Sequence, residues 1–197
     1  MIKIISSAGI EELNGKVKFF TTGCGRRIAF YEYGDPVGVP IIFCHGTGSH
    51  IHVMLLHEAA KELGYRIIVP DRPGIGLSDI DHKRTILDGA SDTAALADHL
   101  GIGRFGVMGI SGGNPTLLAC AYRLADRLTF VIDLAGAAPL YTDPAALKEL
   151  GRVDRIYARL GSRLPLWLFQ IPFSLLGFQQ KMLKSPKAFA DLMRSSM

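Results

Sequence analysis

The sequence predicts an α/β fold built on a doubly wound, mostly parallel sheet that opens with an antiparallel hairpin. Three observations predict it. Short, continuous apolar runs recur along the first 140 residues, as is typical of strands buried on both faces. Segments with apolar residues at helical spacing alternate with these runs. A tight Gly-Cys-Gly turn joins the first two strand-like segments.

The first elements in the chain are the two strands of the hairpin, at 16–22 and 26–33, on either side of that turn. The next strand is the apolar run 40–44, which ends in His45-Gly46. After it, apolar residues at helical spacing predict a helix over 53–63, which Gly64 is placed to terminate.

The alternation continues through the middle of the chain. The apolar run 66–69 predicts a buried strand that Pro70 breaks, and a helix follows over 86–100. The run 105–108 is the fifth strand and leads into Gly109. Apolar residues at 117, 121, 124 and 128 predict a third helix, and 129–134 reads as a sixth strand.

After Pro139 the strand pattern does not return. We therefore expect two parts, with residues 1–143 forming a sheet-based core and residues 144–197 forming a helical segment. The second part is strongly basic, with nine Lys or Arg against three Asp or Glu. Without a nucleic-acid-binding motif, these charges are typical of solvated helix faces, and no nucleic-acid partner is expected.

The composition is that of a globular protein, with 48% hydrophobic and 20% charged residues. No uncharged apolar stretch of 18 residues occurs and the N-terminus does not resemble a secretory signal, so we expect a cytoplasmic protein with no membrane-spanning helix. Its three cysteines lack metal-ligand spacing, and reduced thiols are the simplest account. No metal or organic cofactor is expected.

The most specific motif is Gly109-Ile110-Ser111-Gly112-Gly113, a G-x-S-x-G sequence between a predicted buried strand and a predicted helix. A sharp strand-to-helix turn brings neighbouring backbone so close that its flanking positions need glycine, and it raises the serine above the carboxyl edge of the sheet. Ligands bind at that edge in open α/β sheets. We therefore interpret Ser111 as a catalytic nucleophile.

A second motif, His45-Gly46-Thr47-Gly48, follows the third strand. A serine that attacks an acyl carbonyl creates an oxyanion, which preorganised N–H donors must stabilise. We expect one donor from Gly112 and the other from Thr47, with Gly46 and Gly48 allowing close approach of the backbone. His45 could be a general base, but its place at a strand end favours a supporting role in the loop.

A third segment, Asp71 to Asp79, follows the fourth strand and has the composition of a turn-rich loop. Its charged residues are expected to tie neighbouring loops together and not to act on a substrate.

These three segments, in this order and spacing, resemble the α/β-hydrolase family, and most closely its capped members with a serine nucleophile. That group includes esterases, lactonases, haloperoxidase-like enzymes, iminopeptidases and C–C bond hydrolases. The resemblance extends over residues 17–139. It implies that Ser111 is the nucleophile, that the amide of Thr47 contributes to the oxyanion hole, and that residues 144–197 are cap helices covering a pocket for a small organic acyl substrate.

The sequence departs from the family in its histidines, because the triad order of this fold is Ser, then Asp or Glu, then His. All six histidines precede Ser111: His45, His50, His52, His57, His82 and His99. Asp133 and Asp143 follow Ser111, but for these a buried structural contact and a loop turn are the favoured interpretations. The triad is thus incomplete in these 197 residues, and the plainest expectation is that the chain stops inside the cap.

Several alternatives remain open. His50 or His52 lies just beyond the oxyanion loop and is a candidate for a substitute base. The fold could belong to a non-catalytic protein that binds a small molecule. The apolar stretch 164–178, with nearby lysines, could act at a membrane surface, although two prolines interrupt it. Finally, the sixth strand would be an exposed edge, which predicts self-association.

Overall fold

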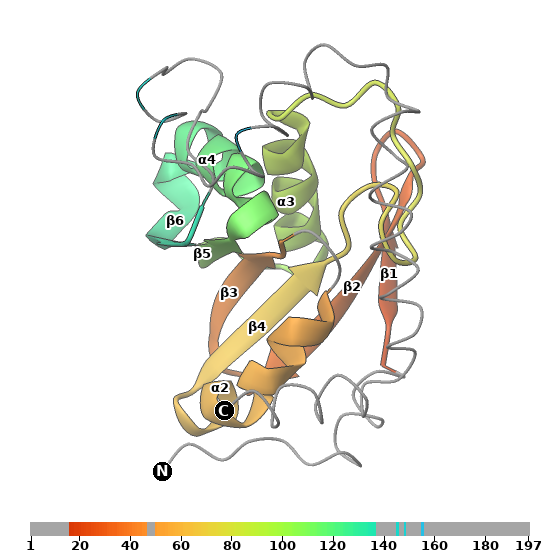
Figure 1. Cartoon of the computed structure of the whole chain (residues 1–197). Coiled ribbons are helices and arrows are strands. Elements are labelled where there is room, and N and C mark those ends of the chain that lie inside the picture. The colour runs from red at the N-terminus through yellow and green to blue at the C-terminus, as the bar shows by residue number, and fades with distance from the viewer. Residues whose placement is uncertain (1–15, 47–49, 137–144, 146–147, 149–154, 156–197) are drawn as a thin grey trace, which may run out of the picture. The chain divides into compact units, whose positions relative to one another are not determined.

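The computed structural model describes residues 16–46 and 50–136, together with positions 145, 148 and 155. In these residues six strands form one sheet in the order β1-β2-β4-β3-β5-β6 (Figure 1). Strands β3 to β6 are parallel to one another, whereas β2 is antiparallel to both β1 and β4. The predicted α/β sheet with its opening hairpin is confirmed. The strands are β1 (Lys18–Thr21), β2 (Arg27–Gly34), β3 (Val39–Cys44), β4 (Tyr65–Pro70), β5 (Phe105–Ile110) and β6 (Leu128–Leu134).

Helices cover both faces of this sheet. Ile41 of β3 lines a hollow with Ala60 of α2, whereas its neighbour Ile42 packs with Leu96 of α3 in a buried core cluster. Because successive strand residues point to opposite faces, α2 and α3 lie on opposite sides of the sheet. Helix α4 packs against α3. The α-helices are α2 (His57–Glu62), α3 (Asp88–His99) and α4 (Asn114–Arg123), and short 3-10 turns form η1 (His50–Leu56), η2 (Ser111–Gly113) and η3 (Ala125–Arg127).

Two predicted helices differ from the observed ones. The segment predicted as a helix over 53–63 begins as a 3-10 turn, η1, and becomes α-helical only at His57. At the start of η1 the side chain of His50 is hydrogen-bonded to Asp71. The spacing of apolar residues does not predict a tertiary contact of this kind. Leu128, predicted in the third helix, is the first residue of β6. Leu124 and Leu128 both pack against the core, so the apolar spacing continues beyond the helix end.

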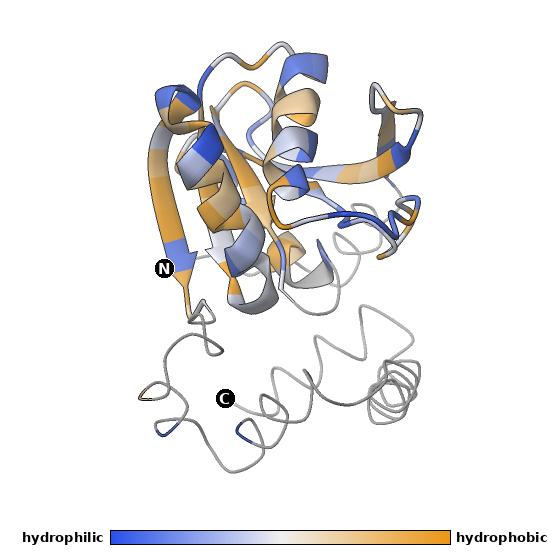
Figure 2. Cartoon of the chain, turned by 90° about the horizontal axis from the view of Figure 1, so that it is seen from above, coloured by the Kyte–Doolittle hydropathy of each residue, from blue (hydrophilic) through white to orange (hydrophobic). Residues whose placement is uncertain are grey.

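The central strands consist mostly of hydrophobic residues, whereas the helices combine hydrophilic and hydrophobic residues (Figure 2). Strand β6 is the last in the sheet order, and its residues 131–134 are exposed. Leu134, for example, is 40% exposed. Self-association through this edge stays a prediction.

The chain separates by its contacts into two compact units, Met1–Gly136 and Ala137–Met197. The second unit, and with it the predicted cap, lies almost wholly outside the described residues, so the predicted boundary at 143 stays a prediction. Within the described ranges, no helix is long and apolar enough to cross a membrane.

Candidate active site

Ser111 lies at the turn where β5 ends and α4 is about to begin. Its φ of 49° is in the left-handed region, which is strained for a residue with a side chain. The residue is exposed, at the carboxyl edge of the parallel strands. Space requires glycine at position 113, because a Cβ there would overlap the carbonyl oxygen of Cys44, whereas a Cβ on Gly109 would make a tight contact of 3.0 Å with Cβ of Leu117. The sequence therefore places a strained, accessible hydroxyl above the sheet.

The loop after β3 approaches this turn directly. A Cβ on Gly46 would lie 3.2 Å from the carbonyl oxygen of Ile110 and 3.4 Å from Cβ of Ser111. Gly46 therefore lies beside Ser111, and Gly112 follows Ser111 in the same turn. The predicted donor Thr47 and the supporting Gly48 lie outside the described residues.

Arg72, in the loop after β4, connects these two segments. Its Nη1 donates a hydrogen bond to the carbonyl oxygen of Gly112 at 2.9 Å, and its Nη2 donates one to that of Gly46 at 3.0 Å. The sequence predicts that the 71–79 loop ties its neighbours together, but it does not single out Arg72. The available signal is an arginine two residues beyond the end of a strand, at the same sheet edge as the two motifs.

His45 is almost fully buried beneath the loop and has partners on both ring nitrogens. Its Nδ1 lies 2.9 Å from the carbonyl oxygen of Gly46, and its Nε2 lies 3.3 Å from the backbone nitrogen of Arg72. A carbonyl can only accept and a backbone N–H can only donate, so these partners assign the proton to Nδ1. Burial lowers the pKa of His45 to about 4, and the ring is neutral at pH 7. Its contacts fit the supporting role that the sequence favours.

We expect His45 to make the fold sensitive to acid. The unfolded residue binds a proton near its ordinary pKa of 6.5, whereas the folded residue resists protonation down to about pH 4. Its contribution to stability is therefore complete above pH 6.5 and is lost as the pH falls through 4, by about 3 kcal/mol. Urea unfolding followed by circular dichroism at pH 7.5 and pH 4 measures this loss.

The comparison that isolates His45 uses His45→Asn, which has no titrating side chain. The free energy of unfolding of this variant should fall by about 3 kcal/mol less than that of the wild type over the same pH range. His82→Asn, at an exposed position, should keep the wild-type pH dependence. Equal pH dependence in the wild type and in His45→Asn would contradict the assignment.

Next to His45 lies a buried polar network centred on Asp71, whose side chain is fully inaccessible. Its carboxylate accepts hydrogen bonds from Nδ1 of His50 at 3.0 Å, from the backbone N–H of Leu77 at 3.1 Å and from the hydroxyl of Tyr31 at 3.4 Å. The rings of Tyr31 and His50 are stacked. Burial, and then the negative charge of Asp71, raises the pKa of Tyr31 to about 12. The sequence gave no reason to connect these three side chains.

This network places His50 away from Ser111. The histidine stacks on β2 and is bonded at the end of β4, and β3 lies between β4 and the strand that carries Ser111. The end of β4 and the nucleophile turn are therefore separated by the end of β3 in the sheet. This placement favours a structural role over that of a substitute base. The side chain of His52 lies outside what the structure describes.

Asp133 makes the structural contact that the sequence favours, although it is exposed and not buried. Its Oδ2 accepts a hydrogen bond of 2.7 Å from the side-chain amide of Asn114, the first residue of α4. Because this contact lies near the carboxyl end of β6, where the strand is open, the carboxylate stays accessible. Asp143 lies outside the described residues.

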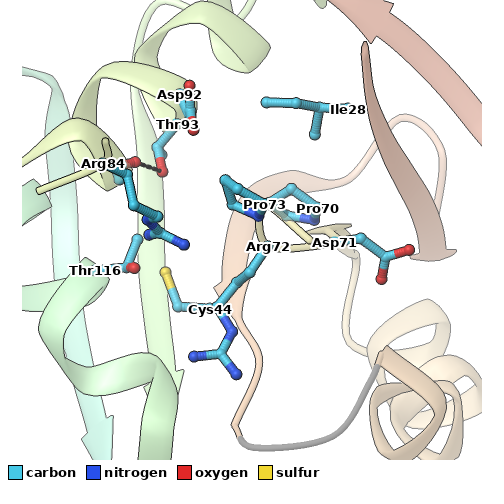
Figure 3. A pocket seen from close by; sticks show the side chains of 11 residues that line it. Ile28, Cys44, Pro70, Asp71, Arg72, Pro73, Arg84, Asp92, Thr93 and Thr116 are labelled. Carbon is cyan, nitrogen blue, oxygen red and sulfur yellow. Dashed lines mark hydrogen bonds between the residues drawn. The ribbon is translucent and has the colours of Figure 1, made fainter. Parts of the chain in front are cut away.

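A small cavity lies behind Arg72, between the loop after β4 and the helices α3 and α4 (Figure 3). Its volume of about 30 Å³ has room for a water molecule but not for an organic substrate. Asp71 and Arg72, though consecutive, point in different directions there (Figure 3). In residues 16–46 and 50–136, no three His, Cys, Asp or Glu side chains are grouped to hold a metal ion.

The sequence of this chain matches a protein family and several known proteins. A model described as "Alpha/beta hydrolase family" matches residues 41–195. The "Uncharacterized hydrolase YcgS" of Bacillus subtilis is 32% identical and aligns with 73% of this chain and 55% of its own length. "Haloalkane dehalogenase 2" of Mycobacterium tuberculosis is also 32% identical, with 69% of this chain and 47% of its own length aligned.

A solved structure shares the fold as well. The enol-lactonase from Burkholderia xenovorans superposes with a TM-score of 0.50 and 25% identity, over 56% of this chain and 44% of its own. The chain spans about half the length of the curated relatives described above.

Proposed function

This chain belongs to the alpha/beta hydrolase family, and from that premise we propose that Ser111 is the nucleophile of an enzyme that hydrolyses carbonyl substrates: esters, thioesters, lactones or amides. The observation that carries the proposal is the strained and exposed position of Ser111 beside Gly46. A residue held at unfavourable φ on a rigid sheet edge, facing another loop, is typical of a nucleophile turn.

In the proposed reaction the hydroxyl oxygen of Ser111 attacks the substrate carbonyl carbon, and a general base takes the hydroxyl proton. The amides of Gly112 and Thr47 stabilise the resulting oxyanion. The leaving group then departs with a proton, and water releases the acyl group from the serine. In this fold the base follows the nucleophile in the chain, whereas all six histidines of this sequence precede Ser111.

Serine at this position favours carbonyl chemistry over that of the dehalogenase relative. Haloalkane dehalogenases and epoxide hydrolases of this fold proceed through an aspartyl ester, and no carboxylate occupies the corresponding position here. The enol-lactonase, whose name describes a lactone substrate, agrees with carbonyl chemistry. No organic cofactor or metal enters the proposed reaction.

A fluorophosphonate probe tests the proposal, because it reacts faster with a serine that faces an oxyanion hole than with an ordinary serine, and an oxyanion hole retains part of this rate when a triad member is missing. We expect the probe to label the wild-type chain at Ser111, as located by mass spectrometry of tryptic peptides, and labelling to disappear in Ser111→Ala. Ser91→Ala, which removes an exposed serine on α3, is the matched control and should be labelled like the wild type. Labelling that persists in Ser111→Ala, or that is absent from the wild type, would contradict the proposal.

One second function has a specific observation in its favour. Two histidines in the described part of the chain, His45 and His50, are engaged in internal contacts. A protein that retains the hydrolase fold but binds a small molecule without catalysis would have this pattern. It predicts an unlabelled wild type that still binds small acyl compounds, measured by their effect on the melting temperature.

A further inference from the structure

The guanidinium of Arg72 connects the two loops of the proposed oxyanion hole. Arg72 follows β4, whereas the carbonyl groups that it binds belong to Gly46, after β3, and to Gly112, after β5. The strands occupy the order β4-β3-β5, so the side chain reaches across β3 to contact both loops. Figure 3 shows it extending past Cys44, at the end of β3.

The hydrogen bond from Arg72 to the Gly46 carbonyl also restrains the N–H group in the same peptide unit. A trans peptide is planar, so its carbonyl and its amide N–H point in opposite directions. The carbonyl of Gly46 shares its peptide unit with the amide of residue 47, the predicted oxyanion donor. An arginine that fixes the direction of the Gly46 carbonyl therefore fixes the direction of that donor. Its hydrogen bond also polarises the peptide, which strengthens the N–H on the other side.

The second contact acts less directly, on the turn that carries the nucleophile. The carbonyl of Gly112 belongs to the peptide that follows the Gly112 amide, the other predicted donor. Holding this carbonyl restrains the turn just after Ser111. Both donors are then restrained by one rigid group, because the nitrogens of a guanidinium lie in a fixed plane.

His45 provides a third connection between Arg72 and the Gly46 carbonyl. The backbone N–H of Arg72 donates to Nε2 of His45, and Nδ1 of His45 donates to the same Gly46 carbonyl that Arg72 binds. Arg72 thus acts on the loop through its side chain and through its backbone. Burial lowers the pKa of Arg72, yet a guanidinium remains protonated at any pH at which the protein is folded.

We propose that Arg72 is the positioning residue of the oxyanion hole, holding the carbonyls of Gly46 and Gly112 and so fixing the loop after β3 relative to the turn that carries Ser111. This inference rests on the proposed function of Ser111. Arg72 touches no reacting atom and acts only through the two peptides. Its effect should fall on the chemical step, in which the oxyanion forms, and not on the initial binding of a ligand.

The test is the kinetics of fluorophosphonate labelling of Ser111 in the full chain, which separate the affinity of the probe from the rate of phosphonylation. Arg72→Ala should lower the rate about 10–100-fold, somewhat less than the loss of an oxyanion donor itself, with little change in affinity. Arg72→Lys keeps the charge but cannot span both carbonyls, so its rate should lie between those of Arg72→Ala and the wild type. Added guanidinium ion at millimolar concentration should restore part of the rate in Arg72→Ala.

Arg84→Ala is the matched control, because Arg84 lines the same small cavity (Figure 3). It should label at the wild-type rate. Hydrogen exchange followed by mass spectrometry gives a readout that is independent of chemistry: peptides covering 43–50 and 109–114 should exchange faster in both Arg72 variants than in Arg84→Ala.

The outcomes separate the two proposals. A wild type without labelling overturns the nucleophile and this inference with it. A labelled wild type whose rate is unchanged in Arg72→Ala overturns the role of Arg72 alone. A fall in rate that Arg72→Lys shares in full, that guanidinium does not relieve, and that comes with weaker probe affinity would indicate general loss of structure and would also overturn it.

Discussion

Replacing Asp71 with alanine should lower the free energy of unfolding by about 3–5 kcal/mol. The buried carboxylate accepts hydrogen bonds from His50, from Tyr31 and from the backbone of Leu77, so its removal leaves two buried donors and one partly buried donor without their acceptor. Such a loss is a large share of the 5–15 kcal/mol that typically stabilises a domain. Urea unfolding followed by circular dichroism at pH 7 measures it.

Asp98 provides the comparison for an acidic residue whose ion pair is exposed. It pairs with Arg127 at 2.8 Å, and its side chain is 67% exposed. Asp98→Ala should therefore cost less than about 1 kcal/mol. If the two alanine variants unfold at the same urea concentration, Asp71 does not anchor the loop in the way that the contacts indicate.

Replacing Gly113 with alanine should lower the free energy of unfolding by at least about 3 kcal/mol. The added Cβ would overlap backbone atoms of Cys44 and approach the carbonyl oxygen of His45. Backbone atoms cannot rotate away as a flexible side chain can, so either the end of β3 or the start of α4 must move. Because both carry the proposed site, labelling of Ser111 should fall together with stability.

Gly103 is the matched glycine, because a Cβ there would meet no atom within 4 Å. Gly103→Ala should change the free energy of unfolding by less than about 1 kcal/mol and leave labelling intact. The same urea titration and the same probe serve for both variants. A Gly113→Ala protein as stable as Gly103→Ala would show that the elbow tolerates a side chain at this position.

The succession of strands and helices could be predicted from the sequence, because local patterns of apolar residues specify both. Strands with continuous apolar runs, such as 40–44 and 105–108, must be covered on both faces of the sheet. The helical segments between them supply this cover and leave few other folds. The prediction failed only at element ends. Leu128 continues a helical spacing yet begins β6, because its burial is decided by the surrounding core and not by its place in a repeat.

The position of the candidate nucleophile also followed from the sequence. A glycine on each side of Ser111, between a strand and a helix, is a steric requirement that can be read directly, and the backbone of Cys44 beside Gly113 is its physical cause. The sequence favoured a supporting role for His45 on the same reasoning, from its place at a strand end.

What the sequence by itself determined is thus the sheet, its order of elements and the place of the turn that carries Ser111. The tertiary structure alone decided which polar groups meet: Arg72 with the carbonyls of Gly46 and Gly112, and Asp71 with His50 and Tyr31. The reason is physical. Apolar burial follows a repeating pattern along the chain, whereas a hydrogen bond between residues 21 to 40 positions apart depends on directions that only the assembled sheet edge fixes.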